Sequence, residues 1–173
     1  MKNIYLIGMP GSGKSTLGRE IAEILQVEHI DTDEMLTKST GMSPEDIILH
    51  HGEHELRKLE HTLLLNLFSR ENLIISTGGG FPVYEDNMII MNENGVTLYV
   101  KYSEEVLWNR LKNDRVRPLS NTYESMVELL RKREGVYGKA KIIINGEDDI
   151  GRNTINAVNA IRKHFLTGKP SSD

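Results

Sequence analysis

The sequence has no cysteine and no hydrophobic run long enough to cross a membrane. The lack of cysteine excludes thiol nucleophiles, disulfide frameworks, cysteine-based zinc sites and iron–sulfur clusters. A membrane helix needs about 18–20 apolar residues, and a signal peptide needs an apolar stretch of about 7–15. Near the N-terminus only Ile4–Ile7 is apolar before glycine and proline interrupt the run. We therefore expect a cytoplasmic protein that does not bind membranes.

Aromatic residues and excess charge are also scarce. Aromatic residues make up 6% of the 173 residues, and the net charge is −4. A mildly acidic chain with scattered basic residues has no general attraction to nucleic acid. The 38% of hydrophobic residues and the 15 glycines still suffice for a buried core. The length suits one domain over residues 1–173, and we expect a monomer that acts on small molecules.

Short β-rich runs alternate with stretches of helical periodicity. In the first helical stretch Leu17, Ile21 and Leu25 share one face. This alternation predicts a three-layer α/β/α fold with a five-stranded parallel sheet between two helical layers. The expected strands are Asn3–Ile7, Val27–Ile30, Leu73–Ser76, Thr97–Val100 and Lys141–Ile144.

Two segments interrupt the alternation. Residues 33–60 are mostly helical and inserted between two strands, with Ser43 and Pro44 starting one helix. Residues 112–122 are rich in charge and asparagine and predict a mobile loop. We expect a flexible tail over residues 168–173. Further helices are expected near Glu55–Ser69, Ser103–Lys112, Tyr123–Arg133 and Asn153–Phe165.

Residues 8–15 match the pattern G-x-x-x-x-G-K-[ST] between an expected strand and an expected helix. Glycines let the backbone wrap around phosphate oxygens, and the helix N-terminus adds positive potential. In such loops Lys14 reaches the β- and γ-phosphates and the Ser15 hydroxyl binds Mg²⁺. The alternative is a glycine-rich turn that binds nothing, but the strand–helix context favours nucleotide binding.

Asp31 and Asp33 follow the second expected strand. Ligands of open α/β sheets bind beyond the carboxyl ends of strands, so both carboxylates should lie beside the phosphate loop. One of them could hold Mg²⁺ through water, and the other could orient or deprotonate an acceptor hydroxyl. The alternative is that they cap a helix N-terminus. The third strand lacks the usual terminal aspartate, so magnesium must depend on Ser15, the phosphates and Asp31.

Three glycines, Gly78, Gly79 and Gly80, follow the third expected strand. Without side chains there, a ligand or another group can approach the backbone closely, although a plain flexible turn is the alternative. Arg57 lies on the inserted segment with Glu60 as a possible orienting partner. Guanidinium groups bind carboxylates and phosphates, although a lone arginine is more often a solvated surface charge. The other candidate arginines are Arg110, Arg115, Arg117 and Arg133.

Together these motifs make the chain resemble the shikimate kinases, which are small P-loop kinases built like nucleoside monophosphate kinases. The resemblance runs in order from Gly8 to Tyr137. It rests on the phosphate loop, Asp31-Thr32-Asp33, Gly52-Glu53 before Arg57, Gly78-Gly79-Gly80, Arg117-Pro118-Leu119, and Arg133 with Tyr137.

The resemblance implies transfer of the γ-phosphoryl group of ATP to the 3-hydroxyl of shikimate, with Mg²⁺ as cofactor, in aromatic amino acid biosynthesis. It implies that Asp33 and the Gly78–Gly80 segment hold shikimate, and that Arg57 and Arg133 bind its carboxylate. Arg117 would close over the phosphates from a lid at residues 112–122. For ATP the resemblance implies Gly11, Ser12, Gly13, Lys14, Ser15 and Thr16, with Arg110 near the adenine.

The adenine loop departs from the family pattern. Residues 145–149 read Asn-Gly-Glu-Asp-Asp, without the basic residues and proline that are common there. Base selectivity is therefore left open. Another small-molecule kinase of this architecture, such as a gluconate kinase, is the nearest alternative. A catalytically silent nucleotide-binding module is the second, although such a module should have lost Lys14, Asp33 or Arg117.

Overall fold

The computed structural model describes residues 1–112 and 122–167. The expected lid at about 112–122 lies outside the described residues except for its two end residues, and Arg115 and Arg117 lie outside them as well. The expected flexible tail over residues 168–173 also lies outside. In the ranges that are described, no helix is both long and apolar enough to cross a membrane.

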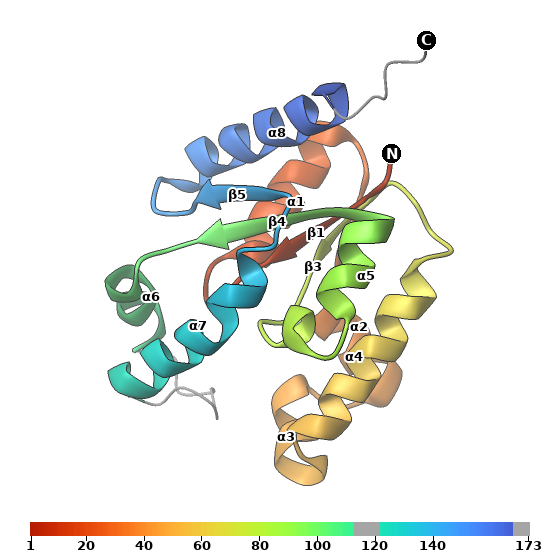
Figure 1. The fold of residues 1–173 in the computed structure, drawn as a ribbon. Helices are drawn as coiled ribbons and strands as arrows, with labels where there is room; N and C mark the ends of the chain where they lie inside the picture. The colour runs from red at the N-terminus through yellow and green to blue at the C-terminus, as the bar shows by residue number, and fades with distance from the viewer. Residues whose placement is uncertain (113–121, 168–173) are drawn as a thin grey trace.

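Five parallel strands form one sheet in the order β2-β3-β1-β4-β5 (Figure 1). The central strand β1 is buried along its whole length, and its Ile4 pairs with Ile74 of β3 and Val96 of β4. The predicted five-stranded parallel sheet is thus confirmed, with strand ends shifted by at most two residues. The strands are β1 (Asn3–Ile7), β2 (Glu28–Asp31), β3 (Leu73–Ser76), β4 (Gly95–Lys101) and β5 (Ile142–Asn145).

Helices cover both faces of the sheet, as the alternation predicted. α1 (Lys14–Leu25) and α8 (Ile150–Thr167) pack against each other and against the sheet, and Figure 1 shows α5 (Asn87–Asn94) and α7 (Tyr123–Tyr137) on the side away from α8. α6 (Glu104–Leu111) packs against α7.

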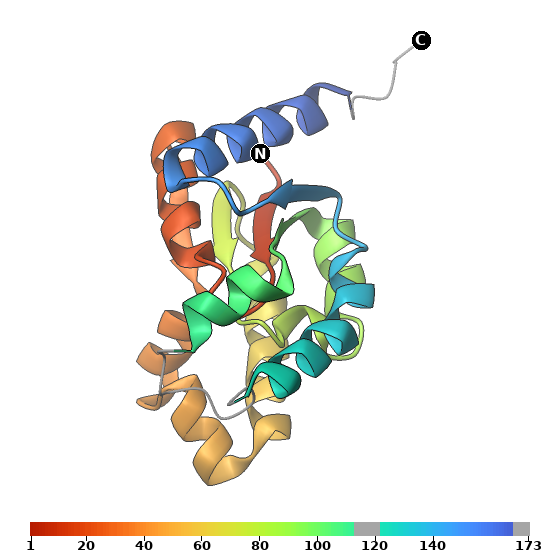
Figure 2. The same cartoon turned by 90° about the vertical axis from the view of Figure 1, so that its left-hand side faces the viewer.

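The inserted segment consists of α2 (Thr32–Thr40), α3 (Pro44–His51) and the first part of α4 (Glu53–Leu67). It has a small core of its own made by Leu36, Ile47 and Leu56, while the end of α4 joins the main core. In Figure 2 this segment, in orange and yellow, lies at the opposite end of the molecule from the blue α8. The predicted helical insertion is confirmed.

The sequence analysis missed α5 and the short 3-10 helix η1 (Phe81–Val83) between β3 and β4. α5 lacks a side-chain N-cap, and its apolar residues are flanked by asparagines without a strong amphipathic pattern. Glu85, just before it, has a positive φ of 45°, which is uncommon for a residue other than glycine. Tertiary packing of Met88 and Met91 into the core therefore determines this helix more than local preference does.

Candidate active site

The phosphate loop connects β1 to α1 at the carboxyl edge of the sheet. Gly11 and Gly13 have φ values of 75° and 76°, which glycine adopts without steric cost. The buried Lys14 side chain folds back over the loop, and its Nζ donates to the carbonyl oxygens of Gly8 at 3.0 Å and Met9 at 2.7 Å. The loop is thus held in a compact shape with its amides at the positive end of α1.

Asp31 lies beside Ser15 and caps α2 at the same time. Its Oδ2 accepts a hydrogen bond from Ser15 Oγ at 2.5 Å, and its Oδ1 accepts from the backbone amide of Asp33 at 2.9 Å. The capping alternative for Asp31 is therefore confirmed. A hydroxyl and a carboxylate side by side next to a phosphate loop also offer the hard oxygen ligands that Mg²⁺ prefers, so these residues fit the ion.

A cleft of about 400 Å³ joins the phosphate loop to the inserted segment. It brings together residues that lie far apart in the sequence, on the loop, β2, α4, the glycine segment and α7. The predicted site residues that line it are Gly11, Gly13, Lys14, Ser15, Thr16, Asp31, Asp33, Arg57, Gly78, Gly79, Gly80 and Arg133. Of the predicted residues in the described ranges, only Ser12 and Arg110 lie elsewhere, in a neighbouring cavity.

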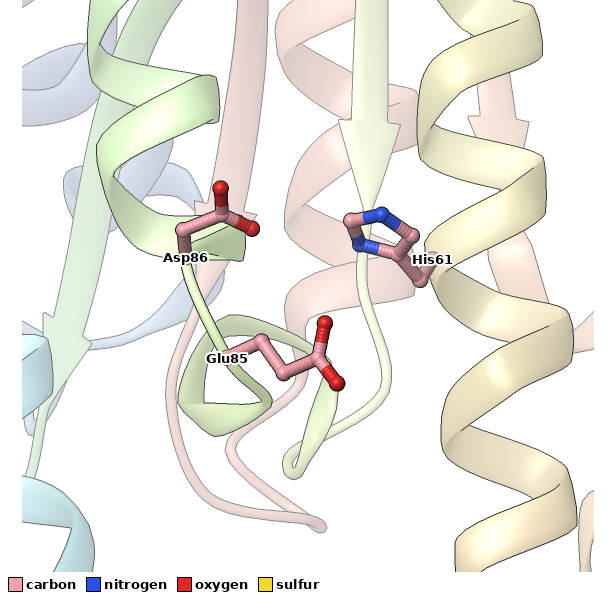
Figure 3. A group of neighbouring side chains, drawn as sticks. All are labelled: His61, Glu85 and Asp86. Carbon is pink, nitrogen blue, oxygen red and sulfur yellow. The ribbon is translucent and has the colours of Figure 1, made fainter.

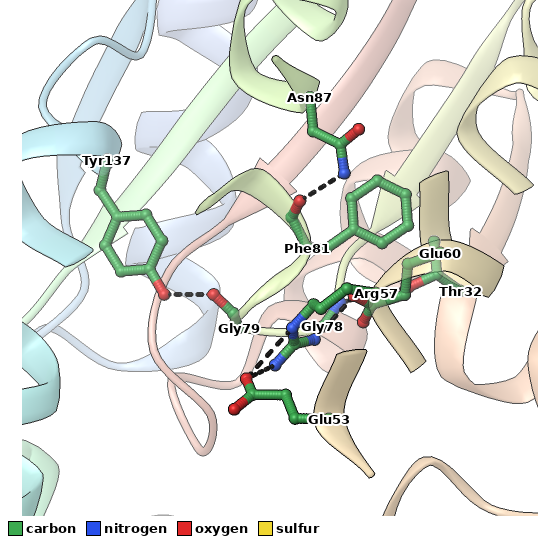
Figure 4. Close-up of polar contacts among 9 residues, drawn as sticks. All are labelled: Thr32, Glu53, Arg57, Glu60, Gly78, Gly79, Phe81, Asn87 and Tyr137. Carbon is green, nitrogen blue, oxygen red and sulfur yellow. Dashed lines mark hydrogen bonds and ion pairs between the residues drawn. The ribbon is translucent and has the colours of Figure 1, made fainter. Parts of the chain in front are cut away.

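Arg57 is a cation of the cleft that two carboxylates hold in place (Figure 4). Its Nη1 donates to Glu60 Oε2 at 2.6 Å, and its Nη2 donates to Glu53 Oε1 at 2.7 Å. Burial disfavours the charged guanidinium, but pairing with Glu60 and Glu53 outweighs it and raises the pKa of Arg57. Arg57 is therefore fixed and charged, which confirms the predicted contact with Glu60 and adds Glu53, which the sequence analysis did not predict as a partner.

Asp33 and Glu60 are two carboxylates in a poorly hydrated part of the cleft. Burial, helped by the charge of Asp31, raises the pKa of Asp33 to about 6. Burial also raises the pKa of Glu60 to about 7, against the opposing effect of Arg57. Asp33 Oδ1 is buried and has no hydrogen-bond partner among the described residues. A carboxylate with a free acceptor and a raised pKa is suited to take a proton from a bound hydroxyl.

The glycine segment leaves no room for side chains. A Cβ atom on Gly80 would lie 2.0 Å from Nη2 of Arg57, and one on Gly79 would lie 2.6 Å from Pro10. The backbone itself therefore forms the wall between the phosphate loop and the arginines. The prediction of a close approach to these glycines is confirmed, and the flexible-turn alternative is wrong because neighbouring side chains occupy the space.

The second cavity, of about 210 Å³, opens on the other side of the phosphate loop and is lined by Ser12, Gly13 and Arg110 among others. The Arg110 guanidinium lies 4.4 Å from the ring centroid of Tyr102 and donates to its hydroxyl at 3.0 Å. Asp148 from the acidic loop lines the same cavity. Arg110 is thus beside the phosphate loop but separate from Asp33, Arg57 and Arg133, which line the cleft.

A separate cluster of His61, Glu85 and Asp86 lies outside the cleft (Figure 3). One ligand atom from each residue lies within 4.8 Å of the others, while both carboxylates belong to exposed residues. His61 Nδ1 is hydrogen-bonded to Asn87 Oδ1 at 2.6 Å. This histidine therefore has a structural partner at the start of α5 that requires no metal ion.

Several cleft residues were not identified from the sequence as site residues. From the inserted segment, Pro44, Glu45, Ile48 and Leu56 line the cleft. At the end of β3, where a magnesium-binding aspartate is usual, Ser76 Oγ instead donates to the carbonyl oxygen of Lys14 at 3.0 Å. The only sequence signal for the inserted-segment residues was their position in the helical insertion.

Comparisons with known proteins agree with this geometry. Residues 10–161 match the family model described as shikimate kinase. The shikimate kinase of Sulfurihydrogenibium sp. is 39% identical over 148 residues, which cover 85% of this chain and 89% of that protein. The structure of shikimate kinase from Acinetobacter baumannii in complex with shikimate superposes with a TM-score of 0.87 at 30% identity and covers 98% of this chain and 95% of that one.

The fold alone is shared more widely. A gluconokinase from Sinorhizobium meliloti has a TM-score of 0.63 but only 17% identity, with 97% of this chain and 98% of that chain covered. That likeness shows a common architecture and does not favour the gluconate alternative. The family model spans most of the sequence, including residues 10–15 of the phosphate loop and all of the cleft residues from Asp31 to Arg133. The chain therefore belongs to the shikimate kinase family.

Proposed function

We propose that this protein transfers the γ-phosphoryl group of ATP to the 3-hydroxyl of shikimate, giving shikimate 3-phosphate and ADP. The observation that carries this proposal is a single cleft that joins a phosphate loop to a fixed arginine and a carboxylate. Shikimate has both a carboxylate and ring hydroxyls, so it requires a cation at one end of its site and an acceptor group at the other. Phosphoryl transfer then depends mainly on positioning and charge stabilisation.

On the phosphate side, Gly11, Ser12, Gly13 and Thr16 would bind ATP through the loop backbone and the start of α1. Lys14 would move its ammonium group toward the β- and γ-phosphates. Ser15 and Asp31 would hold Mg²⁺, which neutralises phosphate charge when it is bound. The hydrogen bond between Ser15 and Asp31 supports this because it already places both oxygens together.

On the acceptor side, Arg57 and Arg133 would bind the shikimate carboxylate, while Gly78, Gly79 and Gly80 would contact the ring through their backbone. Asp33 would accept hydrogen bonds from the ring hydroxyls and take the proton that the 3-hydroxyl loses on phosphorylation. Its raised pKa of about 6 supports this, because a base near the working pH transfers protons most effectively.

The remaining assignments are also proposals. Arg110 would contact the adenine from the second cavity, and Arg117 would stabilise the transferred phosphoryl group from the lid. The single-domain organisation, the monomeric state, the cytoplasmic location and the absence of nucleic-acid and membrane partners stay predictions.

Release of ADP from Mg-ATP tests the function directly. The reaction is run with shikimate, with gluconate and without acceptor, alongside the variant Lys14→Ala. We expect release that depends on shikimate and disappears in the variant. Release of ADP with gluconate alone would mean that gluconate, and not shikimate, is the acceptor. No release despite ATP binding would mean that the protein is a catalytically silent nucleotide-binding module.

A further inference from the structure

Neighbouring side chains hold the glycine segment and Phe81, the residue that follows it, in place. Because three consecutive glycines have no side chains to pack, their backbone must be fixed by its neighbours. Gly78 N–H donates to Thr32 Oγ1 at 3.2 Å, and Asn87 Nδ2 donates to the Phe81 carbonyl oxygen at 2.7 Å. The shortest of these bonds comes from the Tyr137 hydroxyl, which donates to the Gly79 carbonyl oxygen at 2.6 Å (Figure 4). The fourth neighbour, Arg57, packs directly against Gly80.

Tyr137 is held rigidly for this contact. Its side chain is fully buried, and its ring lies 5.1 Å from the ring of Tyr99 on the sheet. Burial raises the pKa of Tyr137 to about 12, so its hydroxyl keeps its proton and remains a donor at any working pH. A buried hydroxyl that donates to a single well-placed acceptor forms a hydrogen bond of fixed geometry.

The same hydroxyl lies beside Arg133, one turn earlier on α7. The charge of Arg133 acts against the rise in the Tyr137 pKa, and Arg133 Nη1 is buried without a hydrogen-bond partner among the described residues. A Cβ atom on Gly79 would lie 2.9 Å from Nη1 of Arg133, so arginine, tyrosine and glycine backbone form one tight group.

We infer that Tyr137 is a positioning residue for the acceptor. Its hydroxyl fixes the Gly79 backbone relative to the Arg133 guanidinium, so that the distance between these two sides of the acceptor site stays constant. This inference rests on the proposed function, in which shikimate lies between these groups. Tyr137 itself touches no reacting atom. Its hydroxyl should therefore affect acceptor binding and leave the phosphate loop unchanged.

Steady-state kinetics of Tyr137→Phe test this inference, with shikimate and ATP varied separately. The substitution keeps the ring and removes only the oxygen, which leaves the Gly79 carbonyl without its donor. We expect the KM for shikimate to rise about tenfold, in line with the loss of one buried hydrogen bond, while the KM for ATP changes less than twofold. Tyr99→Phe is the matched control, since it removes a neighbouring hydroxyl with no contact to the glycines, and both KM values should stay unchanged.

The outcomes separate the inference from the proposed function. Unchanged shikimate KM in Tyr137→Phe, with normal turnover by the wild type, overturns the positioning role alone. Equal rises in both KM values, or a rise matched by Tyr99→Phe, would mean a general effect on packing and would also overturn it. If the wild-type protein does not use shikimate, the proposed function fails and the inference fails with it. The retained KM for ATP in the variant serves as the check that it is folded.

Discussion

Replacing Asp33 by asparagine should stabilise the protein and inactivate it at the same time. Asp33 has a buried Oδ1 without a partner among the described residues, so its ionised form is poorly solvated. Burial raises its pKa from the usual 3.8 to about 6. Each pKa unit corresponds to about 1.4 kcal/mol, so the full shift corresponds to about 3 kcal/mol. Since Asp33 is partly exposed, we expect the neutral amide to raise the free energy of unfolding by about 2 kcal/mol. This corresponds to a rise of about 4–8 °C in melting temperature.

The pH dependence gives the sign of this effect. Below about pH 4 the carboxyl group is protonated in both the folded and the unfolded protein, so asparagine brings no advantage. Between about pH 4 and pH 6 the unfolded chain ionises Asp33 while the folded protein retains the proton, which lowers the free energy of unfolding. Above about pH 6 Asp33 is ionised in both states, and the decrease in the free energy of unfolding is complete. The stabilisation by Asp33→Asn should therefore be full at pH 8 and small at pH 4.

Thermal unfolding at pH 4 and pH 8, combined with the ADP assay, checks this prediction. The kcat should fall by about 100-fold or more because a general base typically contributes at least that much. The matched control is Asp46→Asn, an exposed aspartate whose pKa is lowered by hydrogen bonds from Ser43. There the ionised form is the stabilising one, so this variant should lose a little stability at pH 8. A Tm of Asp33→Asn that is unchanged or lower at pH 8, or equally raised at pH 4, would refute the reasoning.

Three further variants examine the rest of the cleft. Arg57→Ala should raise the KM for shikimate by at least about tenfold with the KM for ATP nearly unchanged, because a charge-assisted contact is lost; a loss of ATP affinity alone would contradict the assignment. Gly80→Ala should have a similar effect on shikimate, since the added methyl group would lie 2.0 Å from the Arg57 guanidinium, and normal kinetics would show that the segment can move aside. Asp31→Asn keeps a good helix cap, so its melting temperature should stay within about 2 °C of the wild type, while the Mg²⁺ concentration for half-maximal activity rises; an unchanged Mg²⁺ requirement would remove Asp31 from the metal site.

Local patterns predicted the phosphate loop and the individual strands and helices because their signals lie within short stretches of sequence, although the strands themselves pair over long distances, as Ile4 does with Ile74. The glycines at residues 8–13 and the adjacent strand and helix signals lie within one short stretch. Short buried strands of isoleucine, leucine and valine alternate with helices that have an apolar face, which is sufficient to predict a parallel sheet. The segment between β3 and β4 was harder, since α5 has no cap and a weak apolar pattern.

By itself the sequence therefore determined the fold class, the phosphate loop and the residue types of the proposed acceptor site. Only the tertiary structure decided that Arg57 is held by Glu53 and Glu60, that Asp33 keeps an oxygen without a partner in the part of the chain that the structure describes, and that Tyr137 reaches Gly79. Tyr137 and Gly79 are 58 residues apart in the sequence, so no local pattern relates them. The pKa values of Asp33 and Glu60 likewise depend on burial, and burial exists only once the chain has folded.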